Sequence, residues 1–175
     1  MGKELELHMK NIILIGFMGC GKSTVGIKLS YRLRRALEDT DKLIEKEEGR
    51  TISEIFATDG EPYFRSLETE CLKKLIQTTD GKIISVGGGL PIRKENHALL
   101  KELGTVIYLR ATPETIYERV KHDTTRPLLQ GDNPQEKIRT LLQERTPIYE
   151  QAADFVIDVD HKDFEMILDE IEKVV

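Results

Sequence analysis

Short runs of apolar residues alternate along the chain with longer stretches in which apolar residues recur at helical spacing. The run "NIILIG" at 11–16 is apolar almost throughout and predicts a fully buried strand. The stretch that follows, 22–35, has its apolar residues at helical spacing and predicts a helix. Strands separated by helices favour parallel pairing with helices on both faces of the sheet. The pattern therefore predicts a three-layer α/β fold around a five-stranded parallel sheet, whose other strands are expected at 35–39, 82–89, 105–110 and 154–159.

Turn and capping residues mark the expected ends of several helices. Residues 40–49 predict a helix that ends on Gly49, and Thr51 followed by Glu54 forms a capping box that starts the next one. A long helix is expected over 60–77. These three helices follow one another without an intervening strand.

Proline marks the start of two later helices. A capping Thr or Asn stands directly before proline at 112–113 and 133–134, which places the proline at the first helical position. A last helix is expected over 163–175. Two stretches are interpreted as mobile insertions, the almost wholly helical 40–77 and the polar, turn-rich 122–133.

Composition limits the classes of protein that fit this pattern. The chain has 175 residues, 39% of them hydrophobic, which predicts one globular domain. Its formal net charge of -5 argues against a general nucleic-acid binder. Apolar runs are too short for a membrane helix, and residues 1–8 show no export signal and are interpreted as an extension. Cys20 and Cys71 lack metal-ligand spacing, so we expect reduced thiols in a cytoplasmic protein.

The segment "GFMGCGKST" at 16–24 matches G-x-x-x-x-G-K-[ST] in full, between a predicted strand and a predicted helix. Its glycines let backbone N–H groups turn toward a polyphosphate, and the helix N-terminus adds positive potential. Lys22 is expected to reach the β- and γ-phosphates, and Ser23 to bind Mg²⁺. We interpret Cys20 as a small filler in the loop rather than a redox sensor. The predicted nucleotide cradle comprises Gly19, Cys20, Gly21, Lys22, Ser23 and Thr24.

Two carboxylates flank one threonine in "LEDTDKLIE" at 37–45. Many P-loop enzymes carry a second acid at the end of another strand to help hold Mg²⁺, but the strand "KIISV" ends in Ser85 and glycines. Asp39 and Asp41 are the nearest strand-end acids, so we predict that one of them reaches the ion through water. Extended backbone would point both side chains into the same cleft. The alternative is that both acids only cap a helix that begins near Thr40.

Three isolated arginines suggest an anion receptor. They are Arg65 in "YFRSLE", Arg126 in "TTRPLL" and Arg145 in "ERTPIY". A guanidinium is the best protein partner of a carboxylate or phosphate, although any one of them could be a solvated surface residue. The glycines of "VGGGLP" at 86–91 follow a predicted strand and allow a ligand to approach the backbone. A tight structural turn is the alternative interpretation.

Together these segments strongly resemble the shikimate kinase family. The resemblance rests on "GFMGCGKSTVG", "DTDKLIE", "EIFATDGEPYFRSLE", "ISVGGG", "RPLL" and "ERTPIYEQAAD", in the family's order and spacing. It implies a P-loop NTPase fold like that of nucleoside-monophosphate kinases, in one domain over 1–175 with a substrate-binding segment at 40–77 and a lid at 122–133. It also implies transfer of the γ-phosphoryl group of ATP to the 3-hydroxyl of shikimate, in chorismate and aromatic amino-acid biosynthesis.

The resemblance further implies roles for single residues. Arg65 and Arg145 would bind the shikimate carboxylate, and Arg126 would swing with the lid onto the phosphates. Asp41 would meet a ring hydroxyl and take its proton, so the catalytic set is Asp41, Lys22 and Arg126. The remaining implied contacts are Gly87, Gly88 and Gly89 to shikimate, Arg119 and Lys162 to the adenine, and Ser23 with, through water, Asp39 to Mg²⁺.

Two alternatives stay open: a P-loop kinase for another small polyol acid such as gluconate, and a non-catalytic nucleotide-binding regulator. The intact P-loop and Asp41 disfavour the regulator. The chain departs from the family pattern at Arg34, Leu37 and Phe164, where glycine, an aromatic residue and proline are common, and we expect effects on packing and nucleotide affinity rather than on chemistry. We expect a monomer that binds ATP, Mg²⁺ and shikimate, with neither nucleic acid nor membrane as a partner.

Overall fold

Five parallel strands form the centre of the molecule. The computed structural model describes residues 10–123 and 131–175, and within them the strands lie in the order β2-β3-β1-β4-β5. Every neighbouring pair is parallel, which confirms the predicted sheet. The strands are β1 (Asn11–Ile15), β2 (Leu37–Asp39), β3 (Ile83–Ser85), β4 (Gly104–Arg110) and β5 (Phe155–Asp158).

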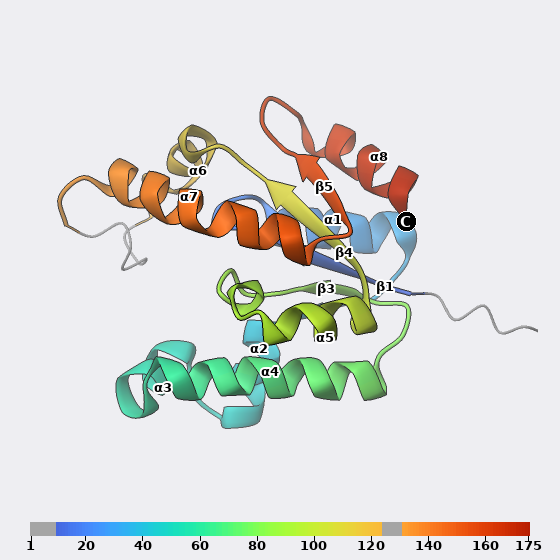
Figure 1. Ribbon diagram of the computed structural model, residues 1–175. Coiled ribbons are helices and arrows are strands. Elements are labelled where there is room, and N and C mark those ends of the chain that lie inside the picture. Colours follow the sequence, from blue (N-terminus) through green and yellow to red (C-terminus); the bar gives the residue numbers. More distant parts are fainter. Residues whose placement is uncertain (1–9, 124–130) are drawn as a thin grey trace, which may run out of the picture.

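Helices cover both faces of this sheet (Figure 1). On one face, α1 (Lys22–Leu33) packs against β1, β2 and β3, and α8 (Phe164–Val174) packs against α1 and β5. On the other face, α5 (Glu95–Leu103) and α7 (Pro134–Ala152) pack against β4. The three-layer α/β/α arrangement is therefore confirmed.

The remaining helices build an outer shelf and a short connection. From the β2 edge the chain runs through α2 (Thr40–Glu48) and α3 (Ile52–Asp59) into α4 (Glu61–Thr78), which packs on α5. Helix α6 (Pro113–Val120) packs on α7. The one-turn η1 (Leu90–Ile92) joins β3 to α5. The predicted substrate-binding segment, 40–77, corresponds closely to α2, α3 and α4.

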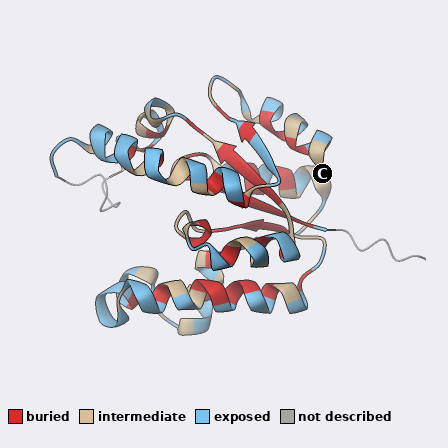
Figure 2. Cartoon of the chain, in the orientation of Figure 1, coloured by how far each residue is buried: buried red, intermediate tan, exposed pale blue. Residues whose placement is uncertain are grey.

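Strand β1 is buried along its whole length (Figure 2). All five of its residues are buried, because it has a strand on each side and helices on both faces. Parallel strands buried on both faces read as continuous apolar runs rather than alternating ones. In-register pairing aligns Leu14 with Ser85 and Asp39 with Ser85. The carboxyl ends of β1, β2 and β3 therefore meet at one edge of the sheet, where the P-loop, the acid pair and the glycines follow.

The helix starts that were expected from capping residues are confirmed. The side chains of Thr51, Thr112 and Asn133 each accept a backbone N–H from the first turn of their helix, and Gly49 ends α2 in a left-handed conformation. The sequence pattern predicts no helix between the glycines at 87–89 and the strand at 105–110. Helix α5 fills that interval, because two parallel strands need a crossover long enough to return the chain to the same edge.

Part of the predicted lid lies outside the described residues. Residues 124–130, including Arg126, belong to that part, as do 1–9. Among the residues that the structure describes, no helix is both long enough and apolar enough to cross a membrane.

Candidate active site

The glycine-rich loop between β1 and α1 curls around an open space. Gly21 precedes α1 in a left-handed conformation (φ 103°) that favours glycine, and a Cβ there would lie 2.8 Å from the Arg119 guanidinium. Lys22 folds back and donates to the carbonyls of Gly16 at 2.5 Å and Phe17 at 3.2 Å. The first N–H groups of α1 have no intrahelical partner. The loop thus offers backbone donors, a lysine and the positive end of a helix dipole to an anion.

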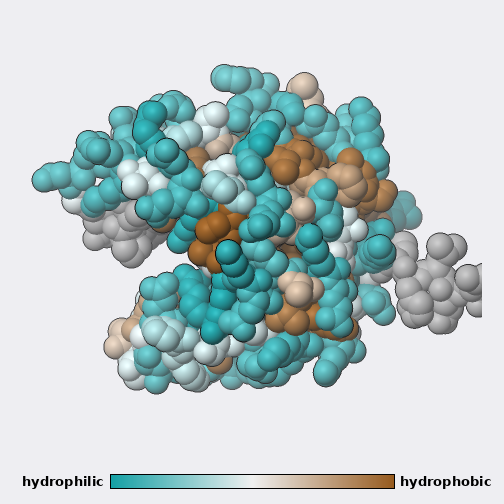
Figure 3. Space-filling model, viewed as in Figure 1, coloured by the Kyte–Doolittle hydropathy of each residue, from teal (hydrophilic) through white to brown (hydrophobic). Residues whose placement is uncertain are grey.

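This loop forms one wall of a cleft of about 600 Å³. Figure 3 shows that the molecule is also hollowed between the α3–α4 end of the shelf and helix α7. Every predicted cradle residue except Cys20 lines the cleft, and the facing wall includes Asp39, Asp41, Gly87 and Gly88. The structure therefore brings the phosphate loop, the acid pair and two of the three predicted glycines to one cavity.

Asp39 and Asp41 line the cleft in a different way from the one that extended backbone predicts. Strand β2 ends at Asp39, whose extended backbone (φ −124°, ψ 123°) and carboxylate cap α2 by accepting the Lys42 N–H at 3.2 Å. Helix α2 begins at Thr40, so Asp41 lies in its first turn. The expectation of two acids on one strand end was wrong, because the helix starts between them. The capping alternative is correct for Asp39, whose carboxylate caps the helix and lines the cleft at once.

The glycine turn at 87–89 lies against charged side chains of α2 and α4. A Cβ on Gly87 would be 2.8 Å from the Asp41 carboxylate and 3.3 Å from that of Glu68. A Cβ on Gly89 would overlap the Arg65 guanidinium. Only glycine permits so close an approach of backbone to these groups. The turn is therefore the place at which Asp41 and Arg65 come together.

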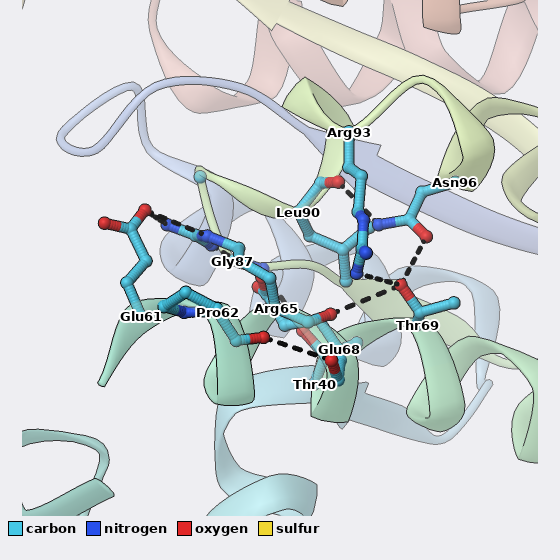
Figure 4. Close-up of polar contacts among 12 residues, drawn as sticks. Thr40, Glu61, Pro62, Arg65, Glu68, Thr69, Gly87, Leu90, Arg93 and Asn96 are labelled. Carbon is cyan, nitrogen blue, oxygen red and sulfur yellow. Dashed lines mark hydrogen bonds and ion pairs between the residues drawn. The ribbon is translucent and has the colours of Figure 1, made fainter. Parts of the chain in front are cut away.

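Two acids hold Arg65 in place beside the turn (Figure 4). Its Nη1 donates to Glu68 at 2.5 Å, and its Nε and Nη2 donate to Glu61 at 3.3 Å. The Glu68 side chain is 1% exposed, whereas that of Glu61 is 62% exposed. Glu68 is thus the fixed partner of the guanidinium. Glu61 is the partner that an incoming anion can replace.

Burial shifts the protonation of both carboxyl groups beside the turn. It raises the pKa of Asp41 to about 6, an effect that the charge of Asp39 increases and that of Lys22 opposes. Burial raises the pKa of Glu68 to about 7, because desolvation outweighs the attraction of Arg65. Both groups therefore change charge near neutral pH, the range in which a proton-accepting side chain is most effective.

Glu68→Gln should flatten the dependence of stability on pH. The pKa of Glu68 is raised from 4.5 to about 7 in the folded state, so the native protein binds this proton more tightly than the unfolded chain does. The free energy of unfolding should therefore fall as pH rises through this interval. The variant should lose that part of the decline, on the order of 3 kcal/mol. Urea denaturation at a series of pH values from about 4.5 to 8 measures it.

Glu70→Gln is the matched control for this experiment. Glu70 lies on the same helix, is exposed, and pairs with Lys73 at 3.2 Å. Its variant should keep the slope of the parent protein, including the smaller decline that Asp41 contributes up to about pH 6. A Glu68→Gln slope equal to that of the control would mean that Glu68 titrates at its ordinary pKa.

Arg145 approaches the turn from α7. Its guanidinium lies 5.7 Å from the centroid of the Phe17 ring and interacts with the phenol of Tyr149 one helical turn later. The Tyr149 hydroxyl donates to the Gly88 carbonyl at 2.6 Å. Arg65 and Arg145 therefore flank the glycine turn from two different helices. Both lie beside the turn rather than in the cleft wall itself.

The residues predicted to contact adenine separate in the structure. Arg119 lines the cleft, donates to the Cys20 carbonyl at 2.7 Å and lies 6.0 Å from the centroid of the Phe164 ring. Phe164 lines the cleft as well. Lys162 instead pairs with Glu170 of α8 at 2.9 Å, outside the cleft wall. The Cys20 side chain is buried and does not line the cleft, which fits a filler residue.

The cleft brings together three of the segments that carried the sequence resemblance, namely the P-loop, the acids of "DTDKLIE" and the glycines of "ISVGGG", and a comparison with protein families identifies the family. The family model described as shikimate kinase matches residues 18–175. The chain belongs to the shikimate kinase family. It is accordingly an ATP-using enzyme of the shikimate pathway, which leads to the aromatic amino acids.

Individual shikimate kinases match almost the whole chain. The enzyme of Thermodesulfovibrio yellowstonii is 47% identical over 165 residues, covering 94% of this chain and 94% of that protein. The solved shikimate kinase of Acinetobacter baumannii, in complex with shikimate, is 37% identical with a TM-score of 0.86, over 95% of this chain and 92% of that one. The structure from Aquifex aeolicus is 40% identical with a TM-score of 0.79, over 93% and 94%.

Some residues that shape this shikimate kinase site received no role from the sequence. Glu68 and Tyr149 are the two that spacing could have found, because they lie three residues after Arg65 and four after Arg145, at the distances where helical side chains meet. The hydroxyl of Thr40, which accepts the Gly87 N–H at 3.1 Å, had no such signal. Its contact joins residues 47 apart in the chain.

Proposed function

We propose that this shikimate kinase binds shikimate between Asp41 and the glycine turn, with the 3-hydroxyl directed at the γ-phosphate of ATP in the P-loop. The observation that carries this proposal is the single cleft of about 600 Å³ that the P-loop, Asp41, Gly87 and Gly88 line together. Phosphoryl transfer depends mainly on holding donor and acceptor in line. The Acinetobacter baumannii relative in complex with shikimate supports the assignment.

Arg65 and Arg145 would bind the shikimate carboxylate. They flank the turn from α4 and α7, and a guanidinium suits a carboxylate because two parallel N–H donors match its two oxygens. The carboxylate would take the place of the exposed Glu61 carboxylate on Arg65. Glu68 would stay in contact with Nη1 and keep the fork oriented. Gly87, Gly88 and Gly89 would let the ring approach the backbone.

Asp41 would accept a hydrogen bond from the 3-hydroxyl and take its proton as the phosphoryl group arrives. Lys22 would leave the carbonyls of Gly16 and Phe17 and donate to the β- and γ-phosphates. Arg119, which lies over the Phe164 ring, would contact the adenine of ATP. Arg126 and the lid at 122–133 stay predictions that rest on the resemblance.

The cleft also suits Mg²⁺, which we propose as the metal ion bound with ATP. Its oxygen donors include the Ser23 hydroxyl and the Asp39 carboxylate. Among the described residues, no three His, Cys, Asp or Glu side chains form a cage for a metal, and Mg²⁺ is usually held by one or two protein oxygens together with phosphates and water. Ser23 would bind it directly and Asp39 through water. The ion would supply positive charge against the phosphates.

A coupled assay of ADP release tests the acceptor directly. ATP and Mg²⁺ are supplied with shikimate, with gluconate or without an acceptor. Rapid release with shikimate alone is the expected result. Equal release with gluconate would support a kinase of another polyol acid, and no release in any arm would support a nucleotide-binding regulator. We propose that the enzyme works as a cytoplasmic monomer.

Arg65→Lys should raise the KM for shikimate by about tenfold or more, because lysine keeps the charge but loses the bidentate fork. The KM for ATP should stay near that of the parent enzyme. Arg32→Lys is the control, since Arg32 pairs with acids of α8 on the outer surface. Steady-state kinetics with each substrate varied in turn measures both constants. An unchanged KM for shikimate would show that Arg65 does not bind the carboxylate.

A further inference from the structure

Two buried hydroxyl groups hold backbone groups of two neighbouring residues in the glycine turn. The Thr40 hydroxyl accepts the Gly87 N–H at 3.1 Å (Figure 4), and the Tyr149 hydroxyl donates to the Gly88 carbonyl at 2.6 Å. Thr40 and Tyr149 are both 0% exposed. They belong to α2 and α7, so the turn is held between two helices that the sequence separates widely. Neither side chain lines the cleft.

A turn of three glycines depends on such contacts. Glycine has more backbone conformations to lose than any other residue, so the turn has little preference of its own for one conformation. A third contact holds its far end, where the Asn96 amide donates to the Leu90 carbonyl at 2.9 Å (Figure 4). The conformation that meets a substrate is therefore imposed by side chains outside the turn.

The phenol of Tyr149 also lies beside an arginine of the proposed site. Arg145 precedes it by one helical turn and interacts with it. Burial raises the pKa of Tyr149, which keeps the hydroxyl protonated and able to donate to Gly88. One O–H group thereby fixes the glycine turn relative to a residue proposed to hold the substrate carboxylate.

Thr40 makes the corresponding connection on the other side. It is the first residue of α2 and stands between the two acids of the cleft. Its bond to Gly87 sets the distance between α2 and the turn, where a Gly87 Cβ would lie 2.8 Å from Asp41. The acceptor site is thus held on the Asp41 side by Thr40 and on the Arg145 side by Tyr149.

We propose that Tyr149 and Thr40 are positioning residues for the phosphoryl acceptor. They act through the Gly87 and Gly88 peptides, without touching substrate, to place the turn relative to Asp41 and Arg145. This inference rests on the proposed binding of shikimate at the turn. It assigns the two hydroxyls an effect on acceptor affinity that is separable from their effect on stability.

Tyr149→Phe tests the proposal by removing one oxygen atom. The KM for shikimate should rise by about tenfold, the effect of one lost buried hydrogen bond, while the KM for ATP stays unchanged and kcat changes by less than about threefold. Tyr108→Phe is the matched control. Tyr108 is 0% exposed and packs against Tyr149 with ring centroids 5.1 Å apart and the rings tilted by 35°, and among the described residues its hydroxyl has no hydrogen-bond partner.

A pair of variants at Thr40 gives a second, independent test. Thr40→Val keeps the size of the side chain and removes the acceptor, so it should also raise the KM for shikimate. Thr40→Ser keeps the hydroxyl, so its KM for shikimate should equal that of the parent enzyme. This pair decides the matter if Tyr149→Phe does not fold.

The outcomes separate this inference from the proposed function. Shikimate-dependent ADP release by the unaltered enzyme tests the function itself. If that release occurs but Tyr149→Phe and Tyr108→Phe share the same KM for shikimate and differ only in melting temperature, the positioning role is wrong. A Thr40→Val enzyme with the KM of Thr40→Ser would overturn it as well.

Discussion

Asp41→Asn is expected to lower kcat by about 10²–10³-fold with MgATP binding intact. A positioned base contributes about 10²–10⁴ in rate, and the loose transition state of phosphoryl transfer favours the lower part of that range. Asp41 lies in the cleft wall against Gly87, and its raised pKa, about 6, allows it to receive a proton near neutral pH. Asparagine keeps the shape and one acceptor oxygen but cannot take the proton. Single-turnover kinetics, with MgATP affinity measured by calorimetry, tests both parts.

Asp39→Asn should differ in kind from Asp41→Asn. Asp39 caps α2 and lines the same cleft as Ser23 of the P-loop, so its variant should need more Mg²⁺ and recover part of its activity when Mg²⁺ is in excess. Excess Mg²⁺ should not restore Asp41→Asn. Two variants with the same Mg²⁺ and shikimate titrations would contradict this division. Two variants that keep full activity and only unfold at lower temperature would favour a capping role for both acids.

Motifs with a built-in backbone geometry were predicted most successfully from the sequence. The P-loop pattern specifies glycines that only certain turns accommodate, so its place between β1 and α1 followed from spacing alone. Capping residues worked for the same reason, because Thr51, Thr112 and Asn133 satisfy N–H groups of their own helix. The apolar run at 11–16 is typical of a strand buried on both faces, and the fully buried β1 confirms that prediction. Local chemistry was enough in each case.

The acid pair shows where local reasoning fails. Whether Asp41 continues a strand or begins a helix depends on one residue, and such boundaries are the least certain part of any sequence interpretation. Helix α2 starts at Thr40 because Asp39 can cap it and because the Thr40 hydroxyl is occupied by Gly87. The Thr40–Gly87 hydrogen bond joins segments 47 residues apart, so the sequence around Thr40 cannot predict it.

The burial of the charged side chains around Arg65 could not be predicted from the sequence either. Arg65 and Glu68 stand three residues apart, the spacing at which helical side chains meet, but the sequence could not show that Glu68 is 1% exposed. That burial decides whether the glutamate weakens or supports anion binding, because a buried partner keeps the guanidinium oriented while the exposed Glu61 can be replaced. Helix α5 and the Tyr149 contact to Gly88 could not be predicted from local sequence either. They depend on which elements pack together.

Arg126→Ala is expected to lower kcat by about 10³-fold, the low end for an arginine that stabilises a transferring phosphoryl group. Arg126 lies outside the described residues, and its proposed role rests on the charges of the described cleft wall. In the described part of the cleft wall the cations are Lys22 and Arg119, and Arg119 is already engaged with the Cys20 carbonyl at 2.7 Å. A γ-phosphoryl group in transfer spreads its charge over three oxygens, which a further cation from the predicted lid would neutralise.

If Arg126 acts only on the transferring phosphoryl group, its loss should lower kcat without changing the affinity for shikimate. In Arg126→Ala, shikimate affinity measured by calorimetry without nucleotide should equal that of the parent enzyme, while kcat with both substrates saturating falls. Arg139→Ala is the control, because Arg139 lies on the exposed side of α7 and pairs with Glu114 at 2.9 Å, away from the cleft; its kcat should not change. A near-normal kcat for Arg126→Ala would leave the transferring phosphoryl group to Lys22 and the metal ion, and would remove Arg126 from the catalytic set.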